Sequence, residues 1–126
     1  MEVRELLSGE VITIAADQTV RDGAIAMNEA GVGSLAVLED GELTGIFTER
    51  DVLHAVAEET DLDEDPISRW MTDYPDSFSP DMDVREAADW MLATGYRHLP
   101  VLENGAVIGM ASIKDVLWAV TDPNDS

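Results

Sequence analysis

The chain has 126 residues, enough for a compact fold with a modest core, and its hydrophobic content of 45% is that of a globular protein. It has 27 acidic residues, only 7 lysines and arginines and no cysteine, so its net charge of −20 disfavours direct binding to nucleic acid or an anionic membrane, and a disulfide or thiolate site is excluded. No apolar run approaches the ~18 residues of a membrane span, and no signal peptide opens the chain, so we expect a soluble, cytoplasmic protein.

The first elements follow simple local patterns. Residues 1–7 form a short helical pattern with one apolar face, and residues 11–14 are a β-rich run. Thr19 and Asp22 have the spacing of a capping box, which predicts a helix that begins after Thr19 and ends at Gly31.

A hairpin and a second helix come next. Residues 34–38 and 43–47 are predicted strands, and Asp40 and Gly41 between them are typical of a tight turn. A helix is predicted from Thr48 to about residue 59, so the order of elements is β-α-β-β-α.

The same order of predicted elements is then repeated with an offset of 64 residues. Residues 13–56 and 77–120 align without a gap and are identical or conservatively replaced at most positions, which indicates an internal duplication. We therefore predict an α/β (α+β) fold of two βαββα repeats related by a pseudo-twofold axis. The predicted parts are repeat 1 (1–60), an acidic linker (61–66), repeat 2 (67–121) and a frayed tail (122–126).

The best-marked part of each repeat runs from a glycine to an aspartate. Its copies are GIFTERD, which ends at Asp51, and GMASIKD, which ends at Asp115. Thr48 and Ser112 precede these aspartates by three residues, which is again capping-box spacing. Helix capping alone explains the pattern, but a helix N-terminus that offers hydroxyl, carboxylate and free N–H groups also suits a ligand.

Cations are rare enough for their positions to be informative. Arg50 and Lys114 occupy equivalent positions directly before the two aspartates, and Arg97 lies ahead of a strand in repeat 2. They indicate a place where an anion is held, or they offset nearby carboxylates. Arg21 and Arg85 also repeat, and we interpret them as structural ion-pair residues in the first turns of helices.

The repeat resembles a known family. Its βαββα order, the stretch from Gly95 to Val101 (GYRHLPV) and the G-h-x-[ST]-x-x-D segment are similar to those of CBS domains. Two in tandem resemble a CBS pair, also called a Bateman module. The resemblance covers about residues 2–121, so we expect a stand-alone CBS-domain protein with no separate catalytic domain.

The resemblance implies ligands that contain adenosine (AMP, ADP, ATP or S-adenosylmethionine), bound in clefts to which both repeats contribute. In the family the aspartate binds ribose hydroxyls, and the Thr or Ser contacts a sugar or phosphate oxygen. Carried over by position, site 1 consists of Ile12, Thr13, Val32, Gly33, His98, Ser112, Lys114 and Asp115. Site 2 consists of Asp76, Ser77, Tyr96, Arg97, Ser34, Thr48, Arg50 and Asp51.

The two sites differ in chemistry. Site 1 has an apolar Ile12, room for a base beside Gly33 and a candidate phosphate partner in His98, although His98 could equally be a surface residue. In site 2 the carboxylate of Asp76 repels phosphate unless an arginine neutralises it, and Tyr96 either stacks on adenine or fills the pocket. We favour site 1. His54 is interpreted as a packing residue.

Three classes of function remain. The first is a regulatory module that senses an adenosyl ligand. The second is a ligand-free module for homodimerisation or for a partner protein, with an interface drawn from Met27, Trp90, Met91 and Trp118. Catalysis is disfavoured because no P-loop, HExxH motif or nucleophile elbow is present, and we expect no metal site. The acidic, lysine-poor composition is typical of halophilic archaeal proteins, or else marks an acidic partner-binding surface.

Overall fold

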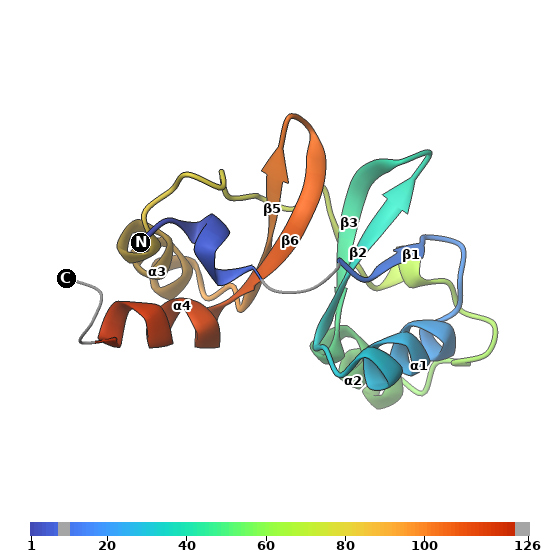
Figure 1. Cartoon of the computed structure of the whole chain (residues 1–126). Coiled ribbons are helices and arrows are strands. Elements are labelled where there is room, and N and C mark those ends of the chain that lie inside the picture. Colours follow the sequence, from blue (N-terminus) through green and yellow to red (C-terminus); the bar gives the residue numbers. More distant parts are fainter. Residues whose placement is uncertain (8–10, 123–126) are drawn as a thin grey trace. The chain divides into compact units, whose positions relative to one another are not determined.

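A computed structural model describes residues 1–7 and 11–122, which form two compact units (Figure 1). We call residues 11–75 the β2–β3 unit, and the described residues 1–7 together with 76–122 the β5–β6 unit. The predicted mixture of helices and strands is confirmed, and the pseudo-twofold packing remains a prediction. The predicted tail, apart from Asp122, lies outside the described residues.

The β2–β3 unit contains a four-stranded sheet in the order β1-β2-β3-β4. Strand β1 (Thr13–Ala15) is parallel to β2 (Ser34–Glu39), which is antiparallel to β3 (Glu42–Thr48). The short β4 (Thr72–Asp73) pairs with β3 and was not predicted. Asp40 (φ 51°) and Gly41 (φ 81°) both have positive φ, as a two-residue hairpin turn requires.

Its helices begin at the caps that the sequence predicts. In α1 (Val20–Ala30) the Thr19 hydroxyl accepts from the Asp22 N–H at 3.1 Å, and the Asp22 carboxylate accepts from the Thr19 N–H at 3.1 Å. Gly31 ends the helix in the left-handed conformation (φ 69°). Helix α2 (Glu49–Ala57) follows β3 directly.

The acidic segment 61–66, expected as a linker, lies against the start of α1. Arg21 forms an ion pair with Asp63, which confirms its structural role. The segment leads into a 3₁₀ helix, η2 (Ile67–Arg69), and the indole N–H of Trp70 donates to the Asp65 carboxylate at 2.5 Å. This hydrogen bond, helped by Arg69, lowers the pKa of Asp65. The segment therefore belongs to the fold of the β2–β3 unit.

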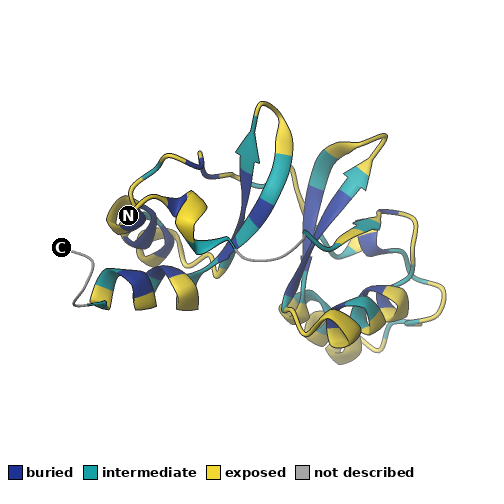
Figure 2. Cartoon of the chain, viewed as in Figure 1, coloured by how far each residue is buried: buried dark blue, intermediate teal, exposed yellow. Residues whose placement is uncertain are grey.

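The β5–β6 unit contains the equivalent elements. Helix α3 (Val84–Thr94), the hairpin of β5 (His98–Glu103) and β6 (Ala106–Ser112), and helix α4 (Ile113–Thr121) all follow their counterparts by 64 residues. The strand expected near residues 75–78 is reduced to one parallel bridge between Phe78 and Val101. In both units the buried strand residues lie mainly in the hairpins, β2–β3 and β5–β6, and the inner sides of the helices are buried, whereas the outer helix surfaces are exposed (Figure 2).

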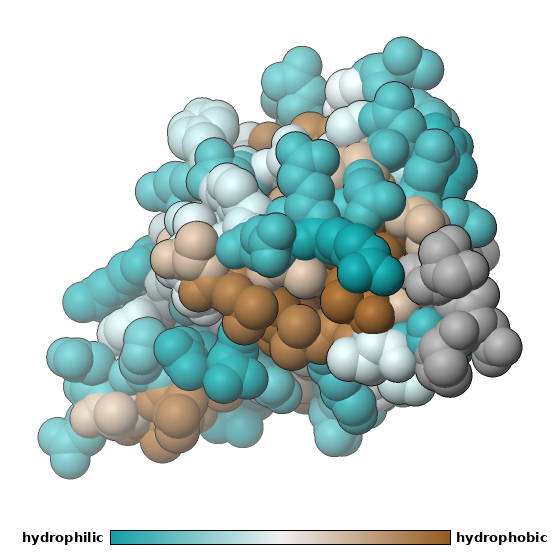
Figure 3. Space-filling view, turned by 90° about the vertical axis from the view of Figure 1, so that its left-hand side faces the viewer, coloured by the Kyte–Doolittle hydropathy of each residue, from teal (hydrophilic) through white to brown (hydrophobic). Residues whose placement is uncertain are grey.

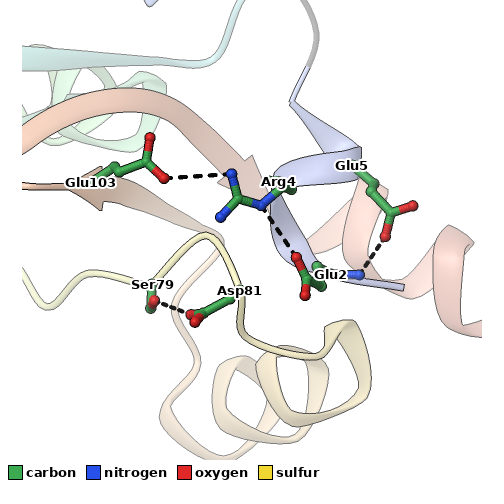
Figure 4. Close-up of polar contacts among 6 residues, drawn as sticks. All are labelled: Glu2, Arg4, Glu5, Ser79, Asp81 and Glu103. Atoms are coloured by element: carbon green, nitrogen blue, oxygen red, sulfur yellow. Dashed lines mark hydrogen bonds and ion pairs between the residues drawn. The ribbon is translucent and has the colours of Figure 1, made fainter.

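The first residues of the chain pack with the second repeat. The 3₁₀ helix η1 (Val3–Leu6) is the counterpart of η2, and the fully buried Val3 belongs to the core of the β5–β6 unit. The N–H of Val3 donates to the Met82 carbonyl at 2.8 Å, and the N–H of Val84 donates to the Met1 carbonyl at 3.0 Å. Arg4 bridges Glu2 and Glu103 (Figure 4). Each unit thus has a 3₁₀ segment packed on it.

The glycine of the repeated Gly-to-Asp segment has a packing role. A Cβ on Gly109 would lie 2.7 Å from Leu7 of the η1 segment, and one on Gly45 would lie 2.5 Å from the sulfur of Met71, which follows η2. Glycine at these two positions allows the 3₁₀ segments to lie directly on β6 and β3.

Candidate functional site

The start of α2 holds three site 2 residues in a fixed arrangement. The Thr48 hydroxyl accepts from the Asp51 N–H at 3.4 Å, and the Asp51 carboxylate accepts from the Thr48 N–H at 2.9 Å. Ser34, which is buried, pairs with Thr48 across β2 and β3, and Arg50 is exposed beside them. Ser34, Thr48, Arg50 and Asp51 therefore lie together, as the sequence predicts for this half of the site.

The carboxyl group of Asp51 has a perturbed pKa. Burial raises the pKa above its ordinary value because desolvation disfavours the charged form, and the hydrogen bonds from Thr48 oppose this shift. Perturbed carboxyl groups are more frequent at binding sites than elsewhere, although structural residues show them too.

The start of α4 is related but not identical. The Ser112 hydroxyl accepts from the Asp115 N–H at 3.1 Å, but among residues 1–7 and 11–122 no return hydrogen bond to the Asp115 carboxylate is formed. Asp115 and Lys114 are exposed, and His98 pairs with Ser112 across β5 and β6. His98, Ser112, Lys114 and Asp115 thus lie near one another on the β5–β6 unit, with a carboxylate more open to solvent than that of Asp51.

The other half of site 1 lies at the edge where β1 and β2 begin. The N–H of Ala36 donates to the Ile12 carbonyl at 3.0 Å, and Thr13 pairs with Ala36. Val32 and Gly33 lead into β2, parallel to β1, so Ile12, Thr13, Val32 and Gly33 share this edge. The expected room beside Gly33 is taken by the Glu49 carboxylate, whose two oxygens lie 3.3 and 3.4 Å from the position of a Cβ there.

The other half of site 2 contains an aromatic stack. Tyr96 stacks on Trp90 with ring centroids 5.5 Å apart and planes 4° from parallel, and Trp90 meets Phe78 edge to face at 5.9 Å. One face of Tyr96 is therefore covered by its own unit. Arg97 is tied to α4, because its carbonyl accepts from the Ile113 N–H at 2.8 Å. Asp76 and Ser77, which are exposed, precede the bridge at Phe78.

Each predicted site draws residues from both units. The structure brings together the residues of each half within its own unit, and the joining of halves across the units remains a prediction.

The cations divide into two groups. Arg4, Arg21 and Arg69 form ion pairs with acidic side chains. Four others form none with the described residues: Arg50, Arg85, Arg97 and Lys114. The prediction that Arg85 is an ion-pair residue is therefore wrong for the described residues. Arg21 pairs with the segment 61–66, and no described segment takes the equivalent place beside α3. The alternative that Arg50, Arg97 and Lys114 offset nearby carboxylates is likewise not supported.

Two further expectations are corrected. His54 is exposed on α2 and is therefore not a packing residue of the core. Met27 and Met91 are at most 5% exposed, so they are core residues and not candidates for an interface.

Reasoning from the sequence missed Glu49 and the pairing of Trp90 with Tyr96. The only sequence signal for Glu49 is that Ile113 replaces it in the second copy, and an acid in the first turn of a helix is ordinarily attributed to the helix dipole.

The described residues contain no group of three His, Asp or Glu side chains placed to hold a metal ion. Among the helices formed by residues 1–7 and 11–122, none is long and apolar enough to cross a membrane.

The raised pKa of Asp51 gives a testable pH dependence. Because the folded state binds this proton more tightly than the unfolded state, the contribution of Asp51 to stability is favourable at low pH and is lost as the pH rises through the folded pKa. The unfolding free energy of the wild type, relative to Asp51→Asn, should therefore fall as the pH rises above the ordinary pKa of an aspartate through the raised pKa of the folded state. Urea denaturation of both proteins measures it, and a difference that grows with pH contradicts burial as the dominant cause.

Comparisons with known proteins identify the family. The model of the CBS domain matches residues 3–58 and 67–122, and the chain belongs to the CBS-domain family as a tandem pair. An uncharacterized 17.7 kDa protein of Acidianus ambivalens is 34% identical over 123 residues, which are 96% of this chain and 74% of that protein.

Solved structures agree in fold. A CBS-domain protein from Agrobacterium tumefaciens is 31% identical, with a TM-score of 0.87 and coverage of 95% of this chain and 99% of that one. A CBS-domain protein from Pyrobaculum aerophilum, complexed with AMP, is 26% identical with a TM-score of 0.87, covering 99% of this chain and 95% of that one.

Proposed function

We propose that this CBS pair is a regulatory module that binds an adenosine-containing ligand and changes its shape or its affinity for a partner in response. The observation that carries the proposal is the placement of unpaired cations. In a chain of net charge −20, Arg50 and Lys114 lie at the starts of α2 and α4 and Arg97 lies before β5, without ion pairs to the described residues.

Stabilisation of the helices does not explain why these cations are present. A cation in the first turn of a helix is unfavourable with respect to the helix dipole, which favours anions there. On this chain many carboxylates are available as neighbours, yet these three bases do not pair with them in the part that is described. Such bases suit a phosphate that the helix N–H groups also attract.

The carboxylates and apolar residues supply the rest of the recognition. Asp51 and Asp115 can accept hydrogen bonds from ribose hydroxyls, and Thr48 and Ser112 can contact sugar or phosphate oxygens. The apolar side chains of Ile12 and Val32 suit the faces of a base. The AMP complex of the Pyrobaculum aerophilum relative supports an adenosyl ligand for this chain. S-adenosylmethionine, ADP and ATP share the adenosine that these groups would recognise.

A ligand that binds only the folded protein raises its stability. At about a hundredfold excess over its Kd, an adenosyl ligand should add about 2.7 kcal/mol to the unfolding free energy and raise the melting temperature by several degrees. AMP, ADP, ATP and S-adenosylmethionine are tested by differential scanning fluorimetry. Asp51→Asn and Asp115→Asn should each weaken the response, because a neutral amide is a poorer acceptor for ribose hydroxyls than a carboxylate.

Asp89→Asn is the matched control, because Asp89 is exposed on α3 outside both sites. Each ligand should raise the melting temperature of this variant by as much as it raises that of the wild type. If all four compounds leave every protein unchanged at millimolar concentration, the proposal of ligand sensing is wrong, and a ligand-free scaffold becomes the better explanation.

A homodimer is also part of the proposal, as are a regulated protein partner and a cytoplasmic location. The support for self-association is apolar surface on the helices: Leu53 and Trp118 are each 66% exposed, and Leu92 is 63% exposed. Figure 3 shows apolar atoms gathered in a patch with hydrophilic side chains around it. If the protein is a dimer, its mass in solution should be twice that of the 13.7 kDa chain, and the dimer should still respond to the ligand.

A further inference from the structure

Glu49, the first residue of α2, lies against the loop between α1 and β2. Both of its carboxylate oxygens are within 3.4 Å of the position that a Cβ on Gly33 would occupy, and its N–H donates to the Gly33 carbonyl at 3.1 Å. The backbone hydrogen bond ties the start of α2 to this loop. The Glu49 carboxylate therefore covers Gly33 at the edge formed with Ile12 and Val32.

The carboxylate of Glu49 has no donor among the residues that the structure describes. Within the two described stretches of the chain, it takes part in no hydrogen bond or ion pair. An ionised carboxylate has two acceptor oxygens and no donor. A carbonyl or phosphate oxygen brought to Gly33 would meet repulsion, whereas an N–H group would form a charge-assisted hydrogen bond.

The equivalent place in the β5–β6 unit has different chemistry. There Ile113 stands in the place of Glu49 and Arg97 in the place of Gly33, with the Ile113 N–H donating to the Arg97 carbonyl at 2.8 Å. That loop presents a cation and an apolar side chain, so it favours a phosphate or carbonyl oxygen. A carboxylate that favours an N–H group over an oxygen atom is therefore present at this position only in the β2–β3 unit.

The neighbours of Glu49 indicate which part of a ligand lies there. Because β1 and β2 are parallel, Ile12 and Val32 lie at the same edge, and both are apolar. Val32 is 39% exposed, which leaves apolar surface available to a flat base. The loop that leads into β2 contains no lysine or arginine of its own, and the cation next to Glu49, Arg50, belongs to the start of α2.

We propose that Glu49 is a specificity-determining residue that selects a purine with an amino group at position 6 and rejects a purine with a carbonyl there. The inference rests on the proposed function, because it takes the base of an adenosyl ligand to lie beside the Glu49 carboxylate that covers Gly33. The Glu49 carboxylate accepts a hydrogen bond from the 6-amino group of adenine and repels the 6-carbonyl oxygen of hypoxanthine.

AMP and inosine monophosphate test this directly, since they differ only at position 6 and in the proton at the adjacent ring nitrogen. Their Kd values are measured on the full chain by NMR from the amide resonances of Val32 and Gly33, which report this loop and not the other one. The wild type should prefer AMP by about tenfold or more, the scale of a hydrogen bond to a charged group.

Glu49→Gln is nearly isosteric, and its amide can donate to a carbonyl oxygen, so the preference should shrink to about threefold or less. Glu42→Gln is the control, because Glu42 is exposed at the hairpin end of β3, away from this edge, and it should keep the wild-type preference. An unchanged AMP preference in Glu49→Gln overturns the role of Glu49 while leaving adenosyl binding intact. Absence of AMP binding to all three proteins contradicts the proposed function itself.

Discussion

Replacing Val3 by aspartate should unfold the β5–β6 unit. Val3 is fully buried in the core of that unit, in a cluster of apolar side chains. A carboxylate there is desolvated without a partner, which costs about 4 kcal/mol or more. The backbone hydrogen bonds of Val3 to Met82 and of Arg4 to Pro80 would be lost together with the packing.

The effect should be confined to one unit, because none of the described residues 1–7 belongs to the core of the β2–β3 unit. Amide hydrogen exchange resolves this: protection in α3, β5 and β6 should collapse, while protection in α1, β2 and β3 persists. The same change at the exposed Val32 is the control and should cost less than about 1 kcal/mol. Full protection of β5 and β6 in Val3→Asp would show that the first residues are dispensable.

The second large effect concerns Phe47 and Gly23. Phe47 is fully buried, and Phe47→Ala should cost about 3–5 kcal/mol through lost burial and the cavity left behind. A Cβ on Gly23 would lie 2.6 and 2.9 Å from the Phe47 ring and 3.1 Å from Ile67. Gly23→Ala should therefore destabilise the protein, although alanine in a helix is intrinsically favoured by about 1 kcal/mol.

The β5–β6 unit combines side-chain sizes differently at the equivalent two positions. Its equivalent residues are Ala87 and Ala111, both buried, so a small residue on the strand accompanies a larger one on the helix. The double variant Gly23→Ala with Phe47→Ala should consequently cost less than the sum of the single variants, by about 1–2 kcal/mol. Urea denaturation of the four proteins measures this coupling, and strict additivity would show that the ring and the glycine do not constrain each other.

The same asymmetry between the repeats affects the candidate site. Thr48 and Asp51 form a reciprocal cap, whereas Ser112 and Asp115 form only half of one. The sequence favours the site with Asp115 because of Gly33 and His98. The structure adds that the Glu49 carboxylate covers Gly33, and that the equivalent position in the other repeat is Ile113.

Short-range interactions were predictable from the sequence. The caps at Thr19 and Thr48, the helix end at Gly31 and the turn at Asp40 and Gly41 depend on hydrogen bonds or φ values within a few residues. The duplication extended these predictions to the second repeat, and the family resemblance supplied the type of ligand and the candidate residues.

The tertiary structure alone decided contacts between residues far apart in the chain. Neither periodicity nor motif spacing indicates that Val3 packs beside α3, that Tyr96 stacks on Trp90 or that Glu49 covers Gly33. Similar positions in the first turn of a helix also left Arg21 paired and Arg85 unpaired among the described residues. The physical reason is that a cap is complete within one turn of helix, whereas packing and ion pairing depend on which distant segment the folded chain brings alongside.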